Sequence, residues 1–175
     1  IINRLQTLYI MIVSGLTMGM QPIVGYNFGA QKIDRVKQTL RLGIISGVVI
    51  TSSGFVICEF FPHAVSALFT VWDELIDLAV GGIRLTVLMF PFVGAQIVIG
   101  NFFQSIGKAK ISIFLSLTRQ LLYLLPCLLL FPNWWGLEGI WISMPVSDAL
   151  AFITAVVSLM IYIKKVSKQH PVVAE

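Results

Sequence analysis

Five long apolar segments, separated by short polar stretches, constrain the fold of this chain more than any other feature. They cover residues 5–30, 40–61, 75–105, 111–131 and 139–163. Each reaches or exceeds the roughly 20 residues that a helix needs to cross the hydrocarbon core of a bilayer. Membrane-spanning strands are about half as long and alternate in polarity, and these segments do not alternate. We therefore expect an all-α integral membrane protein with five transmembrane helices.

The composition excludes an ordinary soluble domain. Hydrophobic residues make up 57% of the chain and charged residues only 11%, whereas soluble domains carry about 25% charged residues. The net charge of +4 does not indicate nucleic-acid binding, because the cations lie in short patches between apolar segments. Cys58 and Cys127 lie within apolar segments, so we interpret them as small buried residues and not as a disulfide or metal pair. The lipid bilayer is the predicted partner.

The polar stretches predict the orientation of the chain. Stretches with and without cations alternate, and the positive-inside rule assigns the cationic ones to the cytoplasm. Their cations are, in chain order, Lys32, Arg35, Lys37 and Arg41, then Lys108 and Lys110, then Lys164, Lys165 and Lys168. We therefore expect the chain to start outside and to end in a basic cytoplasmic tail at residues 164–175.

Small residues recur at a spacing that favours close helix packing. Without a hydrophobic driving force between helices in lipid, a small residue at every fourth position lets two backbones approach. Three pairs have this spacing: Gly15 with Gly19, Gly25 with Gly29, and Gly43 with Gly47. They predict a packed helical bundle and carry no information on function.

Four motifs, in order along the chain, resemble one known family. They are Gln-Pro-Ile-x-x-Tyr-Asn-x-Gly-Ala at residues 21–30, Phe-Gln-Ser-Ile-Gly-Lys-Ala-Lys at 103–110, Ser-Leu-Thr-Arg-Gln at 116–120, and Gly-Leu-Glu-Gly-Ile-Trp at 136–141 with Pro-Val-Ser-Asp at 145–148. The chain resembles the C-terminal lobe of multidrug and toxic compound extrusion (MATE) transporters over nearly its whole length.

This resemblance implies an architecture and a function. The family has twelve helices in two six-helix lobes, so residues 1–163 would be the second lobe without its first helix. The N-terminal lobe of the same protein would then be the missing partner. The implied function is export of drugs or toxins, often cationic, by antiport against H⁺ or Na⁺ across the plasma (cytoplasmic) membrane, which is the inner membrane where there are two. No enzymatic activity and no cofactor other than the coupling ion are implied.

The resemblance also bears on the coupling-ion site. The branch that the chain most resembles has its principal cation-binding acid in the first helix of the first lobe. Other branches place acids in the first helix of the second lobe and in the helix that matches residues 75–105. The acid that this chain carries there is Asp77, at the periphery of the segment. We therefore expect the principal cation site outside residues 1–175.

Two opposite charges fall near the middle of the predicted membrane. Arg119 lies about nine residues into the fourth segment from its cytoplasmic side, roughly 13 Å deep at the helical rise. Asp148 lies at a similar depth in the fifth segment, counted from the outer side. Charged side chains are costly in hydrocarbon and face the protein interior or a water-filled cavity. We interpret the two as an intramembrane ion pair, either structural or part of a proton or cation relay.

Neutral polar residues within the apolar segments are candidates for lining a transport pathway. About half of such groups are expected simply to hydrogen-bond neighbouring helices, and the others to face a cavity. The candidates are Gln21, Tyr26, Asn27, Gln96, Asn101, Gln104 and Gln120. Prolines in or near the middle of the helices, Pro22, Pro91, Pro126 and Pro145, predict kinks that suit a transporter.

Two other functions are compatible with a polytopic membrane chain. A flippase for lipid-linked oligosaccharides of the same superfamily should present several cations at membrane depth to a diphosphate, and Arg119 is the clear one here. A membrane-embedded enzyme would need clustered nucleophiles, acids or metal ligands at one depth, and no such cluster is visible. His63 and His170 lie far apart outside the membrane, so we expect no metal site.

Overall fold

The computed structural model of the chain describes residues 2–70 and 72–169, and all regular structure in these residues is helical. The elements, in order, are α1 (Ile2–Gly29), α2 (Ile33–Phe60), α3 (Pro62–Ala67), α4 (Asp73–Val87), α5 (Phe90–Ser105), α6 (Ala109–Leu117), the π-helical segment η1 (Thr118–Leu124) and α7 (Leu125–Gln169). The predicted all-α fold is confirmed.

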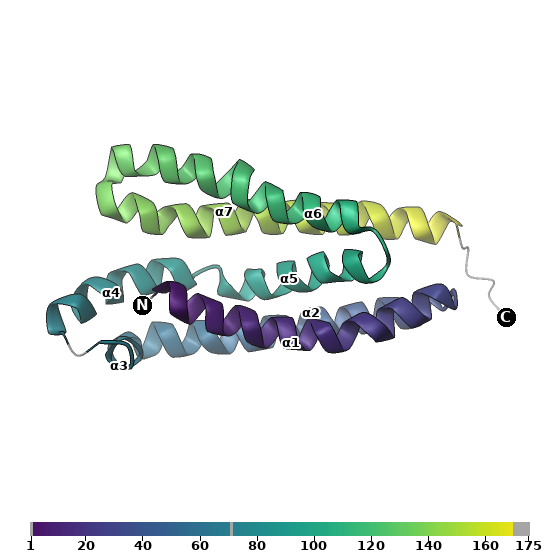
Figure 1. The fold of residues 1–175 in the computed structure, drawn as a ribbon, viewed down its shortest axis with the longest axis horizontal. Coiled ribbons are helices and arrows are strands. Elements are labelled where there is room, and N and C mark those ends of the chain that lie inside the picture. Colours follow the sequence, from purple (N-terminus) through teal and green to yellow (C-terminus); the bar gives the residue numbers. More distant parts are fainter. Residues whose placement is uncertain (1, 71, 170–175) are drawn as a thin grey trace.

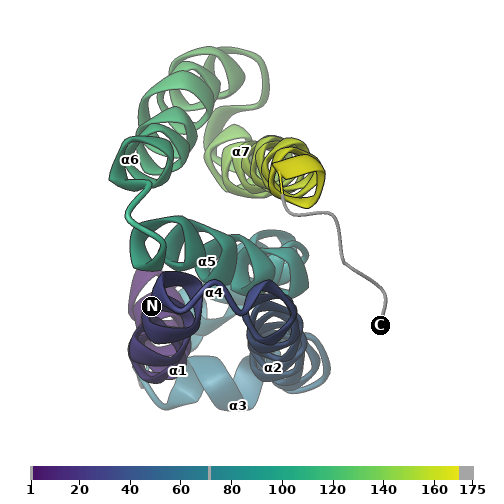
Figure 2. The ribbon, with the colours of Figure 1, turned by 90° about the vertical axis from the view of Figure 1, so that its right-hand side faces the viewer.

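The helices form two layers that meet at α5 (Figures 1 and 2). Helices α1 and α2 pack side by side and against α5, whereas α6, η1 and α7 form a hairpin on the other side of α5. Val24, Val98 and Phe103 are completely buried in the main core. Many large apolar side chains on the outer faces remain exposed, as expected of a protein that is surrounded by lipid.

The helices are long enough to cross a membrane. Three stretches of the described chain meet the length and hydropathy requirements, Asn3–Gly29, Ile33–Phe60 and Ala109–Val166, and the bent pair α4–α5 makes a fourth if it is taken as one span. The stretch Ala109–Val166 reverses direction at Gly136, so it supplies two antiparallel arms (Figure 1). The protein is therefore a multi-pass membrane protein.

The second helix begins earlier than the predicted start at residue 40. Helix α2 starts at Ile33 and takes in Arg35, Lys37 and Arg41, which the sequence had assigned to a loop. Arginine, lysine and glutamine are good helix formers, so a polar first turn does not prevent a helix. The reversal between α1 and α2 is confined to residues 30–32, where Gln31 adopts a positive φ of 58°.

The third predicted segment, 75–105, is not one continuous helix. It is divided at Leu88 and Met89 into α4 and α5, whose axes differ by 52°. Pro91 lacks the backbone N–H that would bond the carbonyl of Val87, so the helix cannot continue through this point. A further short helix, α3, starts with Pro62 and joins α2 to residue 70; the sequence had not predicted it.

The fourth and fifth predicted helices, 111–131 and 139–163, are joined by a single residue and not by a loop. Gly136 has φ 56° and ψ −132°, and the backbone is helical on both sides of it. A residue with a Cβ rarely adopts this conformation, so glycine is required for the tight reversal. The second arm continues to Gln169 and takes in the first part of the predicted tail; residues 170–175 lie outside the described residues.

Helices α2 and α5 make the closest backbone contact in the bundle. A Cβ on Gly94 would lie 2.5 Å from the carbonyl oxygen of Gly47 and 2.5 Å from Thr51 Oγ1. Of the three predicted glycine pairs, only Gly43 with Gly47 lies at such a contact within the described chain, because the positions of Gly15 and Gly19 are open. The glycine spacing predicted a packing site correctly in α2 but not in the first part of α1.

Candidate functional site

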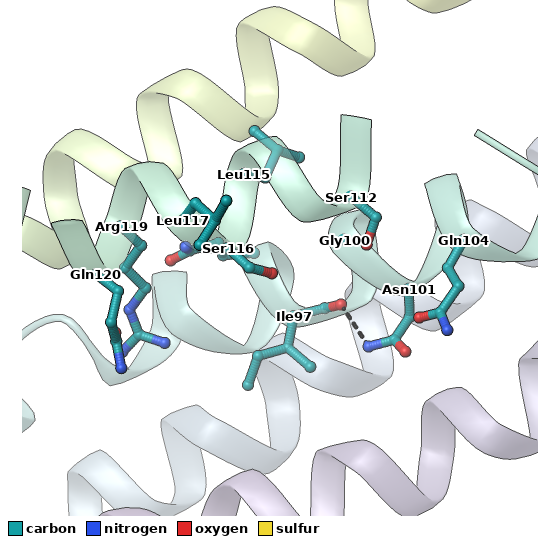
Figure 3. A pocket seen from close by; sticks show the side chains of 11 residues that line it. Ile97, Gly100, Asn101, Gln104, Ser112, Leu115, Ser116, Leu117, Arg119 and Gln120 are labelled. Atoms are coloured by element: carbon teal, nitrogen blue, oxygen red, sulfur yellow. Dashed lines mark hydrogen bonds between the residues drawn. The ribbon is translucent and has the colours of Figure 1, made fainter. Parts of the chain in front are cut away.

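A polar pocket of about 450 Å³ lies between α5 and the arm formed by α6 and η1 (Figure 3). Its lining alternates amides and hydroxyls with aliphatic side chains. The lining residues are Gln96, Ile97, Gly100, Asn101, Gln104, Ser112, Leu115, Ser116, Leu117, Arg119 and Gln120. The volume falls within the range of about 300–1,000 Å³ that is usual for small-molecule sites.

Helical spacing explains how the pocket is built. On α5, Gln96, Gly100 and Gln104 follow one another at intervals of four residues, so they share one face of the helix. Ser112, Ser116 and Gln120 have the same spacing on the opposing arm. The sequence analysis did not include the two serines, although their interval of four from Gln120 was a signal that could have identified them.

The structure brings together four of the seven neutral candidates and leaves three outside. Gln96, Asn101, Gln104 and Gln120 line the pocket. Asn101 and Gln104 lie at one end of it, and Gln120 lies beside Arg119 at the other (Figure 3).

The three remaining candidates lie on α1 and do not line this pocket. Gln21 donates to Asn101 Oδ1 over 3.4 Å, so it contacts the pocket wall from behind. Asn27 bonds the carbonyl oxygen of Ile23 in its own helix, and Tyr26 is 76% exposed. A role for Tyr26 and Asn27 would therefore need a surface other than this pocket.

The two intramembrane charges form a direct ion pair. Arg119 Nε and Nη2 each lie 2.8 Å from Asp148 Oδ1. The Asp148 side chain is 3% exposed and the Arg119 side chain 23% exposed, because only the arginine reaches the pocket. The second carboxylate oxygen, Oδ2, is buried and has no hydrogen-bond partner among the described residues.

The π-helical segment η1 carries Arg119 to this position. Its wider turn is visible in the backbone bond from the N–H of Leu125 to the carbonyl oxygen of Gln120, five residues earlier. Single π-helical turns within α-helices often occur at functional sites, because they change the direction in which neighbouring side chains point. Here Thr118 is buried while the next two residues, Arg119 and Gln120, line the pocket.

A second polar contact joins the same two arms. Tyr123 donates to Thr154 Oγ1 over 2.8 Å, since the Thr154 hydroxyl itself donates to the carbonyl oxygen of Leu150. Together with the ion pair, this bond fixes how the two arms of the hairpin lie along one another.

No carboxylate lines the pocket within the described chain. Glu59 lies 3.9 Å from Arg84 at an exposed position, and Asp77 is exposed on α4. Among the described residues, no group of three or more histidine, cysteine or acidic side chains is placed to hold a metal ion; His170 lies outside them. The pocket therefore offers hydrogen bonds and one guanidinium, and not an acidic cation site.

A polar pocket enclosed by membrane-spanning helices, with a charge pair at membrane depth, defines a membrane protein of the transporter class. The MatE family model matches residues 1–129, and the chain belongs to this family.

Curated relatives from two bacteria resemble most of the chain. It is 22% identical over 148 residues to an FAD transporter of Shewanella oneidensis, which covers 85% of this chain and 33% of the relative. It is 24% identical over 157 residues to the multidrug export protein MepA of Staphylococcus aureus, with 87% and 33% covered. The chain thus spans about a third of the length of the relatives that it matches.

Solved structures of the family share this fold. The MATE multidrug transporter DinF-BH, solved in complex with a drug, is 37% identical, has a TM-score of 0.83, and matches 90% of this chain and 35% of its own. An inward-facing MATE transporter of the MOP superfamily matches with a TM-score of 0.87 and 19% identity, covering 94% of this chain and 39% of its own. An outward-facing one gives 0.88 and 19%, covering 95% and 38%.

Proposed function

We propose that the chain forms the second lobe of a MATE-type exporter that removes drugs or other amphipathic, often cationic compounds from the cell. The function is transport and not catalysis. The observation that carries this proposal is the polar pocket between α5 and η1, at membrane depth in a chain of the MatE family. The names of the relatives, multidrug export protein and multidrug transporter, support the substrate class.

The mechanism we propose is rigid-body movement of this lobe against a partner lobe. Alternating access in such transporters needs each lobe to keep its own packing while the cavity between the lobes opens to either side. The fold fits an inward-facing and an outward-facing structure about equally, with TM-scores of 0.87 and 0.88. This similarity supports a lobe whose internal arrangement is the same in both states.

Antiport against H⁺ or Na⁺ is the energy source we propose. The acid at membrane depth in the described chain is Asp148, and Arg119 already holds it in an ion pair. A free carboxylate is the usual ligand for a transported cation. We therefore propose that the principal cation site lies outside residues 1–175, and that Asp148 has a structural role.

The exporter fits the pocket better than a flippase for lipid-linked oligosaccharides. A diphosphate carries several negative charges, and a site for it should present more than one cation. Arg119 is the one charged residue that lines the pocket in the described chain.

The test is dye export in an efflux-deficient bacterial host. The intact protein, with everything its gene encodes on either side of these residues, is expected to lower the cellular accumulation of a rhodamine dye. Residues 1–175 expressed alone are expected to confer no export, because the proposed cavity needs a second lobe for its other wall. Export by residues 1–175 at the rate of the intact protein would contradict the two-lobe proposal, and no export by the intact protein would contradict the exporter.

A second prediction concerns orientation in the plasma membrane. The alternating loop charge assigns the turn at residues 30–32 and the α5–α6 connection to the cytoplasm. Single cysteines from Gln31→Cys and Lys110→Cys should be protected from an impermeant thiol reagent in intact cells and labelled after permeabilisation. Trp134→Cys, beside the tight turn at Gly136, is the control and should be labelled in intact cells. Labelling of Gln31→Cys before permeabilisation would reverse the assignment.

A further inference from the structure

The pocket presents a positive charge to a ligand and hides the balancing negative charge. Arg119 lines the pocket and is 23% exposed, whereas its partner Asp148 is 3% exposed and lies behind it. No other charged residue lines the pocket in the described chain. Although the pair is neutral as a whole, a group in the pocket lies closer to the guanidinium than to the carboxylate, and it therefore experiences a net positive potential.

Arg119 also has hydrogen-bond donors to spare. A guanidinium carries five N–H donors, and the ion pair uses Nε and Nη2 on a single oxygen, Asp148 Oδ1. The donors on Nη1 and the second donor on Nη2 have no partner among the described side chains in these contacts. Paired donors of a guanidinium match the two oxygens of a carboxylate or phosphate.

The neighbouring amides complete a donor-rich site. The Gln120 side chain lies beside the Arg119 guanidinium (Figure 3). Gln96 is 8% exposed, and its side-chain oxygen has no hydrogen-bond partner among the described residues. A buried amide without a partner is costly, so this side chain is expected to gain one when the pocket is filled.

We propose that this pocket binds the anionic group of an amphipathic ligand, a carboxylate or a phosphate, through Arg119. Ile97, Leu115 and Leu117 supply apolar wall for the rest of the molecule. The inference rests on the proposed function and sharpens its substrate class. Among molecules of one shape, those with an anionic group, zwitterions included, bind better than those that are only cationic.

The test uses one rhodamine dye in two forms, the free carboxylic acid and its ethyl ester. The two share the same ring system, but the acid is zwitterionic at neutral pH and the ester is cationic. Binding of each to the intact protein is measured by fluorescence polarisation in nanodiscs of phosphatidylcholine. The acid should bind at least about tenfold more tightly, since a charge-assisted hydrogen bond is worth a factor of this size or more.

A neutral replacement of the ion pair identifies the residue responsible. The double variant Arg119→Gln with Asp148→Asn removes both charges and keeps the side chains polar, so that no buried charge is left alone. It should lose the preference for the acid and keep its affinity for the ester, which also shows that it is folded. Tyr123→Phe, in the same hairpin but outside the pocket, is the control and should keep the preference.

The outcomes separate the two proposals. Equal affinities of wild type for acid and ester, or a preference that survives in the double variant, would overturn the anion site while leaving dye export intact. If the intact protein neither binds nor exports either form, the proposed function fails and the anion site with it. Repeating the titration with phosphatidylglycerol in the nanodiscs distinguishes the source of the anion: a transported solute predicts no change, whereas a lipid headgroup predicts about a tenfold loss of dye affinity.

Discussion

Replacing Arg119 by leucine is expected to destabilise the intact protein by about 3–5 kcal/mol. The substitution leaves the Asp148 carboxylate buried, with neither oxygen bonded, since Oδ1 bonds Arg119 and Oδ2 has no partner among the described residues. Asp148→Leu should cost a similar amount by leaving the guanidinium alone. Partial exposure of Arg119, at 23%, makes the loss for Asp148→Leu the smaller of the two.

The double variant Arg119→Leu with Asp148→Leu should lose less stability than the sum of the two single losses. Two contacting charges share one interaction, so removing both counts that interaction once. The measurement is a double-mutant cycle on thermal stability in detergent. Tyr123→Phe, which removes a neutral bond between the same two arms, serves as the reference and should cost about 1 kcal/mol. Additive losses for the charged pair would show that the two residues act independently.

Gly94→Val should destabilise the bundle by about 3 kcal/mol, the upper end of the range for overpacking a core. The first added carbon would lie 2.5 Å from the backbone oxygen of Gly47, which cannot move without displacing α2. It would also lie 2.5 Å from Thr51 Oγ1, which already bonds that same oxygen over 2.9 Å. Helices α2 and α5 must therefore separate.

The matched control for Gly94→Val is Gly100→Val on the same helix. A Cβ at Gly100 meets no atom within 4 Å, so the same side chain is added to α5 without a clash. The change in melting temperature of both variants, measured in one detergent, isolates the helix contact from the cost of a β-branched residue. Equal shifts for the two variants would show that the α2–α5 contact can relax at little cost.

The sequence predicted the membrane class and the spans well because hydrophobic length is a strong constraint in lipid. It predicted the helix ends poorly, since the polar first turn of α2 is as helical as the apolar part that follows. The bend before Pro91 was predictable in kind, but its position at Leu88 and Met89 depends on how α4 and α5 pack against neighbouring helices.

The pocket was predictable in part. Amides at membrane depth are expensive enough to stand out, and four of those predicted as candidates line it. The serines did not stand out, because a serine in a lipid-embedded helix can bond its own backbone. The π-helical turn has no sequence pattern of its own, so the direction of Arg119 and its contact with Asp148 had to come from the three-dimensional arrangement.

The two polar bonds between the arms of the hairpin cross one another. Tyr123 is nearer the turn at Gly136 than Arg119 is, yet its partner Thr154 is farther from the turn than Asp148. Sliding one arm along the other would stretch one of these bonds whichever way it moved. The hairpin is thus braced against shear in both directions, and a push on the end of α7 would reach α6 and the pocket wall without slip.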